Sequence, residues 1–229
     1  MNEKNTKEGI QKWWLKNIAF LIIAGAALFL SSGKIDWLMA WVYLFSILII
    51  IFANAAVMDQ ELLQERSSLQ RGTKKWDVAL ASIVAIWGPL VIWITAGLDI
   101  RFEWTQGMPP ALQVVSIIFV ILGGLTVTWA MAANKFFSAT VRIQSDRNHT
   151  VVTRGPYKYV RHPGYLGGIL HTIMTPVALG SWAALLPGLF VVGIFIVRTY
   201  LEDKVLQKEL DGYKKYSSTI RYRLIPGIW

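Results

Sequence analysis

The residues best suited to chemistry lie between positions 149 and 168, in the stretch HTVVTRGPYKYVRHPGYLGG. Its cationic and tyrosine side chains are Arg154, Lys158, Arg161, His162, Tyr157, Tyr159 and Tyr165. Tyrosine faces attract cations, and arginine binds carboxylates in bidentate fashion. The same stretch holds two prolines, each of which restricts the residue before it to extended conformations. Its four glycines permit sharp turns and close backbone approach. We interpret it as a loop that folds over a small molecule.

A second polar pair, Arg198 and Glu202, follows the last apolar run. Residues four apart on a helix share a face, so the two side chains are neighbours if this segment is helical. Arg198 could then hold a carboxylate while the tyrosines face a sulfonium cation. The simpler interpretation is an ordinary helix ion pair, worth about 0.3–0.5 kcal/mol, beside an interfacial belt of tyrosines. Spacing alone leaves both interpretations open.

The composition indicates an integral membrane protein. Of the 229 residues, 54% are hydrophobic and 16% are charged, against about 25% charged residues in soluble domains. The net charge of +9 is explained by basic loops beside anionic membrane lipid rather than by nucleic-acid binding. The chain has no cysteine and three dispersed histidines. Thiolate chemistry is therefore excluded, and we expect no metal site.

Apolar runs predict an all-α, polytopic transmembrane helical bundle. A helix needs about 20 residues to cross the hydrocarbon core. Four long runs approach or exceed this length, and they cover residues 17–33, 37–58, 78–98 and 111–133. Two runs of 15 residues, 165–179 and 183–197, are separated by three residues and predict a short C-terminal helical hairpin. Whether this hairpin crosses the bilayer fully stays open.

Charge placement predicts the orientation. Of the 23 lysines and arginines, only Lys34 and Arg101 fall on one side of the predicted spans, and the other 21 fall on the opposite side. The positive-inside rule then places both termini and the loop 134–163 in the cytosol. If the hairpin arms are antiparallel, Tyr165 and Arg198 lie at the same membrane level. We therefore expect residues 1–133 to form N-terminal transmembrane helices, and residues 134–229 to form a second unit of cytosolic loop, helical hairpin and C-terminal tail in which the two polar clusters meet.

Two separated blocks resemble one known family. VVTRGPYKYVRHPGYLGG resembles the signature of the isoprenylcysteine carboxyl methyltransferase family, which is similar to the phospholipid N-methyltransferases. The tail RTYLEDKVLQKELDGYKKY and the later Ile225-Pro226 resemble its second part, so the resemblance covers about residues 134–229. The resemblance implies a membrane enzyme that transfers a methyl group from S-adenosylmethionine. It also implies a cofactor held between the last transmembrane helices and a cytosolic cap.

The resemblance also assigns roles by position. Arg198 and Glu202 would be catalytic, with Arg198 on the substrate side and Glu202 also against the cofactor. The implied cofactor-binding residues are Gln144, His149, Thr150, Val151, Val152, Tyr157, His162, Pro163, Gly164, Tyr165 and Glu202. A carboxylate acceptor is already ionised at neutral pH and needs no base. An amine acceptor must lose a proton, with Glu202 as the candidate base.

The acceptor is expected to be lipophilic, such as an isoprenylcysteine-type carboxylate, and to arrive from membrane lipid between helices. Three alternatives stay open: a phospholipid amine N-methyltransferase, an NADPH-dependent reductase of the sterol or steroid type, and a non-enzymatic scaffold. The reductase would need an arginine cluster for the 2′-phosphate, and Arg142, Arg147 and Arg154 are available for one. The small chain suits a prokaryotic plasma membrane, and the sequence predicts no oligomeric state.

Overall fold

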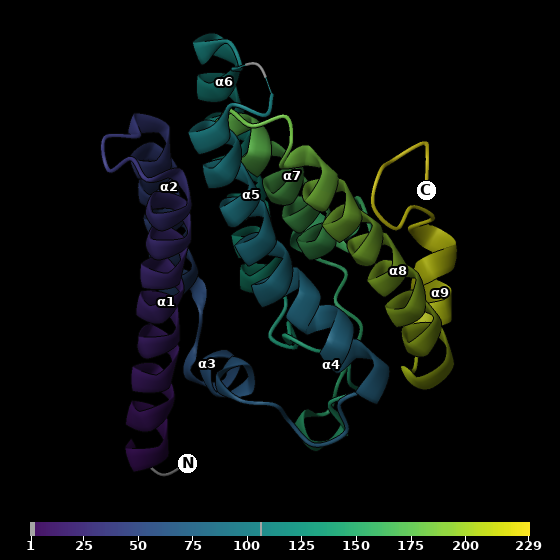
Figure 1. Ribbon diagram of the computed structural model, residues 1–229. Coiled ribbons are helices and arrows are strands. Elements are labelled where there is room, and N and C mark those ends of the chain that lie inside the picture. Colours follow the sequence, from purple (N-terminus) through teal and green to yellow (C-terminus); the bar gives the residue numbers. More distant parts are fainter. Residues whose placement is uncertain (1–2, 106) are drawn as a thin grey trace.

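The computed structural model describes residues 3–105 and 107–229, and within these ranges all regular structure is helical. Figure 1 shows the helices as one elongated bundle. Its α-helices are α1 (Glu3–Ser32), α2 (Leu38–Val57), α3 (Gln60–Ser67), α4 (Lys75–Ser82), α5 (Gly88–Phe102), α6 (Pro110–Ala133), α7 (Pro163–Ala178), α8 (Leu185–Glu209) and α9 (Tyr213–Thr219). A π-helical segment, η1 (Ile83–Trp87), joins α4 to α5. Two 3-10 turns, η2 (Ser145–Arg147) and η3 (Gly155–Lys158), lie in the segment 134–162 between α6 and α7, which we call the cap. The predicted all-α fold class is confirmed.

Five helical segments are long and apolar enough to cross a membrane, which makes this a multi-pass membrane protein. They are Glu8–Ser32, Leu38–Val57, Lys75–Phe102, Pro110–Ala133 and Leu185–Glu209. The first four correspond to the four predicted long spans. The third is continuous through α4, η1 and α5, so it extends four residues past the end of the predicted run 78–98. The sequence analysis did not predict the short helix α3.

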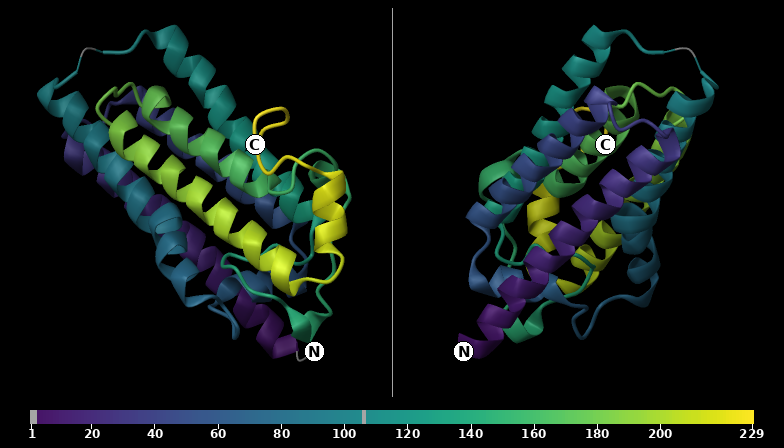
Figure 2. Two further views of the ribbon diagram at one scale, coloured as in Figure 1. Left: turned by 90° about the vertical axis from the view of Figure 1, so that its right-hand side faces the viewer. Right: turned by 60° about the vertical axis from the view of Figure 1, so that its left-hand side comes forward.

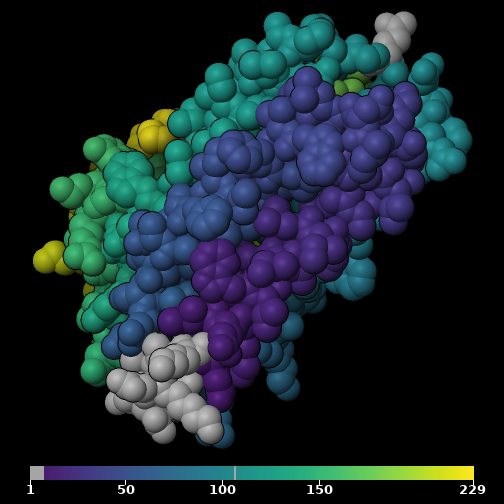
Figure 3. Space-filling view, turned by 90° about the vertical axis from the view of Figure 1, so that its left-hand side faces the viewer, coloured from purple at the N-terminus to yellow at the C-terminus, as the bar shows by residue number. Residues whose placement is uncertain are grey.

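Large apolar side chains are exposed on the outside of the bundle, as lipid contact requires. Figure 3 shows the face over which α1 and α2 lie side by side. Exposed residues of these two helices include Leu15, Ile22, Ile23, Leu30, Leu38, Phe45 and Phe52. In water such a surface would drive aggregation. In hydrocarbon it costs nothing, because lipid tails are as apolar as leucine.

The C-terminal hairpin is formed by α7 and α8, which lie antiparallel and side by side (Figure 2). α7 has 16 residues, close to the predicted short arm, whereas α8 has 25 because it continues past the apolar run through Arg198 and Glu202. The turn between them is anchored to the end of α5. Asp99 accepts hydrogen bonds from the Ser181 hydroxyl at 2.5 Å and from the Ala183 N–H at 3.4 Å. The hairpin therefore reaches the same end of the bundle as the third span.

The glycines at the end of the 149–168 stretch serve helix packing. α7 begins at Pro163, so this part of the stretch is helical rather than loop. A Cβ on Gly167 would lie 2.5 Å from the Gly123 carbonyl oxygen of α6, and a Cβ on Gly168 would lie 2.7 Å from the Phe195 ring of α8. Only glycine permits backbones to approach so closely. These contacts fix the N-terminal end of α7 against both neighbouring helices.

Candidate active site

A pocket lies at the end of the bundle opposite the hairpin turn, between the cap segment 134–162 and the helices α7, α8 and α9. The empty space within it, including the open mouth, is about 830 Å³. Nine of the predicted site residues line it: His149, Thr150, Val151, Val152, Tyr157, His162, Gly164, Tyr165 and Glu202. The antiparallel hairpin thus brings the 149–165 stretch and Glu202 together, as the charge and span pattern predicted.

Three predicted site residues do not line the pocket. Gln144 is fully buried, where its side chain donates to the Phe136 carbonyl at 2.7 Å and accepts from Arg147 at 2.7 Å. Pro163 is the first residue of α7. The guanidinium of Arg198 pairs with Asp77 of α4. Gln144 and Pro163 therefore shape the backbone that carries the pocket residues.

The sequence analysis assigned no role in the site to a further set of pocket residues, which come from the cap and from the region of α8 and α9. From the start of the cap they are Asn134, Phe136, Phe137, Ser138, Thr140, Val141 and Arg142, and from later segments Arg161, Leu206, Leu210, Tyr213 and Tyr216. Leu206, Leu210 and Tyr213 recur at helical spacing, which was the available signal for an apolar stripe. The segment 134–142 carries no such periodicity. Only the folding of the cap over α8 brings it to the pocket.

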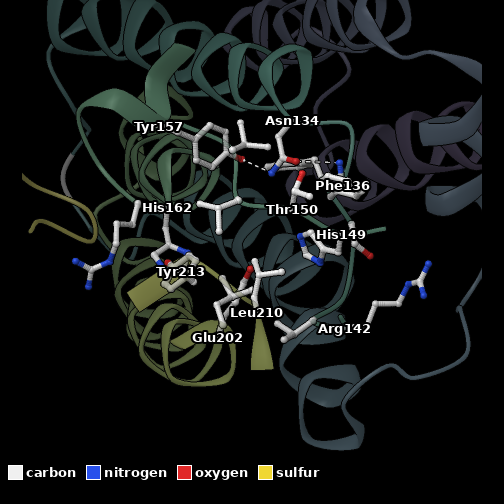
Figure 4. A pocket seen from close by; sticks show the side chains of 18 of the residues that line it. Asn134, Phe136, Arg142, His149, Thr150, Tyr157, His162, Glu202, Leu210 and Tyr213 are labelled. Atoms are coloured by element: carbon white, nitrogen blue, oxygen red, sulfur yellow. Dashed lines mark hydrogen bonds between the residues drawn. The ribbon is translucent and has the colours of Figure 1, made fainter. Parts of the chain in front are cut away.

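The polar end of the pocket is formed by Tyr165, Glu202 and His162. The Tyr165 hydroxyl donates a hydrogen bond to the Glu202 carboxylate, and the Tyr165 ring stacks on His162 with centroids 5.8 Å apart. Figure 4 shows Glu202 and His162 approaching the pocket from one side and His149 from the other. A carboxylate flanked by aromatic rings attracts a small organic cation.

The opposite wall is mainly apolar and holds a neutral histidine. His149 packs on the Phe136 ring with centroids 4.5 Å apart, and its Nδ1 accepts a hydrogen bond from the Gln144 N–H at 3.3 Å. Burial, followed by the nearby charges of Arg142 and Arg147, lowers the pKa of His149 to about 4. The imidazole is therefore neutral at pH 7, and its Nε2 carries the hydrogen.

Tyr157 also lines the pocket, as a neutral phenol. Its hydroxyl accepts a hydrogen bond from the Asn134 side chain at 3.1 Å (Figure 4). Burial raises the pKa of Tyr157 well above its usual range. The Tyr157 carbonyl accepts a 2.7 Å hydrogen bond from the Tyr216 hydroxyl of α9. Tyr157 thus connects the end of α6, the cap and α9 around the pocket.

One buried carboxylate, Asp203 of α8, holds the C-terminal half of the site together. It accepts hydrogen bonds from Arg161 at 2.8 and 3.0 Å, from Arg223 at 2.9 Å and from the Tyr213 hydroxyl at 3.0 Å. Gln207 donates to it at 2.8 Å, and His162 Nε2 lies 3.3 Å away. A buried charge is tolerated only when it is paired in this way. Asp203 therefore fastens the cap, α9 and the C-terminal segment to α8.

Arg198 is buried in a second ion pair. Its Nε and Nη2 lie 2.7 and 2.9 Å from the two carboxylate oxygens of Asp77. Arg198 and Glu202 form no ion pair in the described part of the chain, so the simple helix-pair interpretation does not apply. Arg198 still lies beside the pocket, because its guanidinium carbon is 5.2 Å from the centre of the Tyr165 ring.

The three arginines considered for a phosphate site have protein partners. Arg142 binds Glu65 at 2.8 and 2.7 Å and Asp146 at 2.8 Å, which raises the pKa of Arg142. Arg147 binds Glu61 and Gln144, and Arg154 donates to the Ala133 carbonyl. In Figure 4 the guanidinium of Arg142 points away from the other labelled side chains. These arginines tie the cap to α3 and α6.

Comparison with known proteins shows what the C-terminal part of the chain is similar to. Residues 116–208 match the model of the isoprenylcysteine carboxyl methyltransferase (ICMT) family. The protein-S-isoprenylcysteine O-methyltransferase of Schizosaccharomyces pombe is 32% identical over 111 residues, which is 47% of this chain and 47% of that one. Its namesake from Saccharomyces cerevisiae is 34% identical over 97 residues, or 42% and 38% of the two chains. The predicted family resemblance is confirmed, and the chain spans less than half the length of the relatives it matches.

Proposed function

We propose that this protein, as a relative of the isoprenylcysteine carboxyl methyltransferases, transfers a methyl group from S-adenosylmethionine to the carboxylate of a lipophilic, isoprenylcysteine-type acceptor. The observation that carries the proposal is that one pocket brings together nine of the site residues implied by the family resemblance. Two separated sequence blocks contribute to it, and only the hairpin of α7 and α8 brings them together.

The pocket residues fit the cofactor at both ends. Phe136, Val151, Leu206 and Leu210 give an apolar wall suited to an adenosine group. The Glu202 carboxylate and the rings of Tyr157 and Tyr165 suit the positive charge of a sulfonium. When bound, the cofactor supplies an electrophilic methyl group. The protein's own part is to align the reactants and exclude water, which positioning alone can supply.

A carboxylate acceptor suits this site better than an amine. A carboxylate is ionised at neutral pH and needs no base, whereas an ammonium group must first lose a proton. The one carboxylate that lines the pocket, Glu202, already accepts the Tyr165 hydroxyl proton in a hydrogen bond. The names of the relatives support the same choice. Arg198, beside Tyr165, would then orient the acceptor.

The setting proposed for the reaction is the cytosolic edge of the bilayer. The pocket lies at the end of the bundle that carries the basic loops, and these face the cytosol by the positive-inside rule. Both termini would then be cytosolic, as in a prokaryotic plasma membrane protein. An isoprenyl chain dissolves in hydrocarbon, so its carboxylate would approach the pocket from between helices.

Calorimetry with the S-adenosylhomocysteine product tests the proposal. We expect micromolar binding to the detergent-purified protein and at least a tenfold loss of affinity in Glu202→Gln. Glu209→Gln is the matched control, because Glu209 lies on the same helix but pairs with Lys74 outside the pocket. The control should bind within about threefold of wild type. Binding of NADPH in place of S-adenosylhomocysteine would indicate a reductase instead. Binding of neither compound would favour a non-enzymatic scaffold.

A further inference from the structure

Asp77, the buried ion-pair partner of Arg198, is a charged residue beside the site that lies outside the family motif. Asp77 lies on α4, 121 residues before Arg198, and its side chain is fully buried. Both carboxylate oxygens bind the same guanidinium, and one of them also accepts the Val141 N–H of the cap at 2.7 Å. α4, α8 and the cap therefore meet at one carboxylate.

The pairing fixes one edge of the guanidinium and leaves the other free. An arginine has five N–H donors, and Asp77 takes the Nε hydrogen and one of the two on Nη2. The second Nη2 hydrogen points to the Ala139 carbonyl oxygen at 3.3 Å. Within the described residues Nη1 has no hydrogen-bond partner. Every fully buried side-chain nitrogen there does have one, so Nη1 must keep accessible surface.

The guanidinium of Arg198 lies beside the pocket. The guanidinium carbon is 5.2 Å from the centre of the Tyr165 ring, and Tyr165 lines the pocket and holds Glu202. Without a counter-charge, a buried guanidinium would turn toward the nearest carboxylate, which along α8 is Glu202 four residues away. Asp77 prevents this, because it neutralises Arg198 and takes the other edge.

We infer that Asp77 is a positioning residue that presents the Nη1 donors of Arg198 to the carboxylate of the acceptor. This inference rests on the proposed function and adds to it a residue outside the family motif. A purely structural Asp77 would instead hold α4, α8 and the cap together. Its replacement would then weaken cofactor binding and acceptor turnover to the same degree. The two roles differ in which kinetic constant changes.

The test compares Asp77→Asn with Asp99→Asn. Asp99 is the matched control, because it is a buried aspartate at the far end of the same continuous span, where it holds the hairpin turn. An asparagine at position 77 can still accept the Val141 N–H through its amide oxygen, so the cap contact is kept while the charge is lost. We would measure S-adenosylhomocysteine affinity by calorimetry, and kcat and KM for an N-acetylated S-isoprenylcysteine acid.

For Asp77→Asn we expect kcat/KM for the acceptor to fall about 100-fold, which is the effect that a misplaced reactive group typically has. The affinity for S-adenosylhomocysteine should stay within about threefold of wild type. Asp99→Asn should leave both unchanged. Equal losses of cofactor and acceptor binding in Asp77→Asn, or wild-type kinetics, would overturn the inference. Wild-type protein that forms no ester would instead refute the proposed function.

A double-mutant cycle removes the remaining ambiguity. If Asp77 acts through Arg198, then Asp77→Asn should cost little further kcat/KM in an Arg198→Ala background. Independent, multiplicative losses would contradict the inference. Should Asp77→Asn fail to fold, Asp77→Glu keeps the charge but displaces the guanidinium. We expect this variant to bind S-adenosylhomocysteine normally and to lose at least tenfold in kcat/KM for the acceptor. Wild-type kinetics for this variant would overturn the inference.

Discussion

Replacing Asp203 by asparagine should open the cap and weaken cofactor binding. One oxygen of Asp203 accepts from Arg161 Nε and the Tyr213 hydroxyl, and the other accepts from Arg161 Nη2, Arg223 and Gln207. An amide keeps only one of these oxygens as an acceptor. At best, therefore, the variant loses the pair of bonds at the first oxygen and turns an NH₂ group toward a guanidinium.

The magnitude follows from the bonds lost. Both lost bonds end on an ionised carboxylate, and a hydrogen bond to a charged group contributes about 1.5–3 kcal/mol, so their loss costs at least about 3 kcal/mol. Breaking a buried ion pair typically costs 3–5 kcal/mol, which agrees. If this cost falls on the closed cap, S-adenosylhomocysteine affinity drops roughly 100-fold, since about 1.4 kcal/mol is tenfold.

The predicted loss of S-adenosylhomocysteine affinity is measured by calorimetry on Asp203→Asn, with Asp211→Asn as the control. Asp211 is an exposed aspartate just beyond the same helix, so it controls for loss of one negative charge. We expect normal binding in Asp211→Asn. An Asp203→Asn protein that binds within about threefold of wild type would refute the account of Asp203 as the residue that fastens the cap.

Two further predictions concern packing and pH. Gly167→Val should destabilise the protein by about 1–3 kcal/mol or prevent folding, because its Cβ would meet the Gly123 carbonyl; Gly193→Val, with open space around its Cβ, should melt normally in detergent. For His149, the folded-state pKa of about 4 lies below the ordinary value of 6.5, so the unfolded chain takes up a proton first. Stability should therefore be complete above pH 6.5 and fall as the pH drops toward 4. Thermal melts of His149→Gln should lack that component, and an unchanged pH profile would contradict the assigned pKa.

The spans and the meeting of the two motif blocks could be predicted because each rests on local signals. Long apolar runs, charge asymmetry and the three-residue turn at 180–182 determine which ends of the helices lie together. Gly167 and Gly168 fall both in the stretch interpreted as a loop and in the predicted helical arm 165–179, because close helix packing and loop flexibility leave the same signature in a sequence. Only the positions of α6 and α8 distinguish them.

The ion pairs could not be predicted, because their partners are far apart along the chain. Asp77 lies 121 residues from Arg198, and Glu65 lies 77 residues from Arg142. A charged residue near the end of a span looks like an ordinary interfacial group until the partner helix is placed. The assignment of Arg198 to the substrate side stays a prediction, now with a specific free nitrogen to test.

The central claim is that this pocket directs methyl transfer to a carboxylate. The most direct measurement incubates the purified protein with S-adenosylmethionine labelled in its methyl group and an N-acetylated S-isoprenylcysteine acid, then treats the lipid-soluble product with base. A methyl ester releases its label as methanol, and we predict that nearly all of the label is released. Label that stays bound after base treatment, as in an N-methyl product, or no transfer at all, would contradict the account.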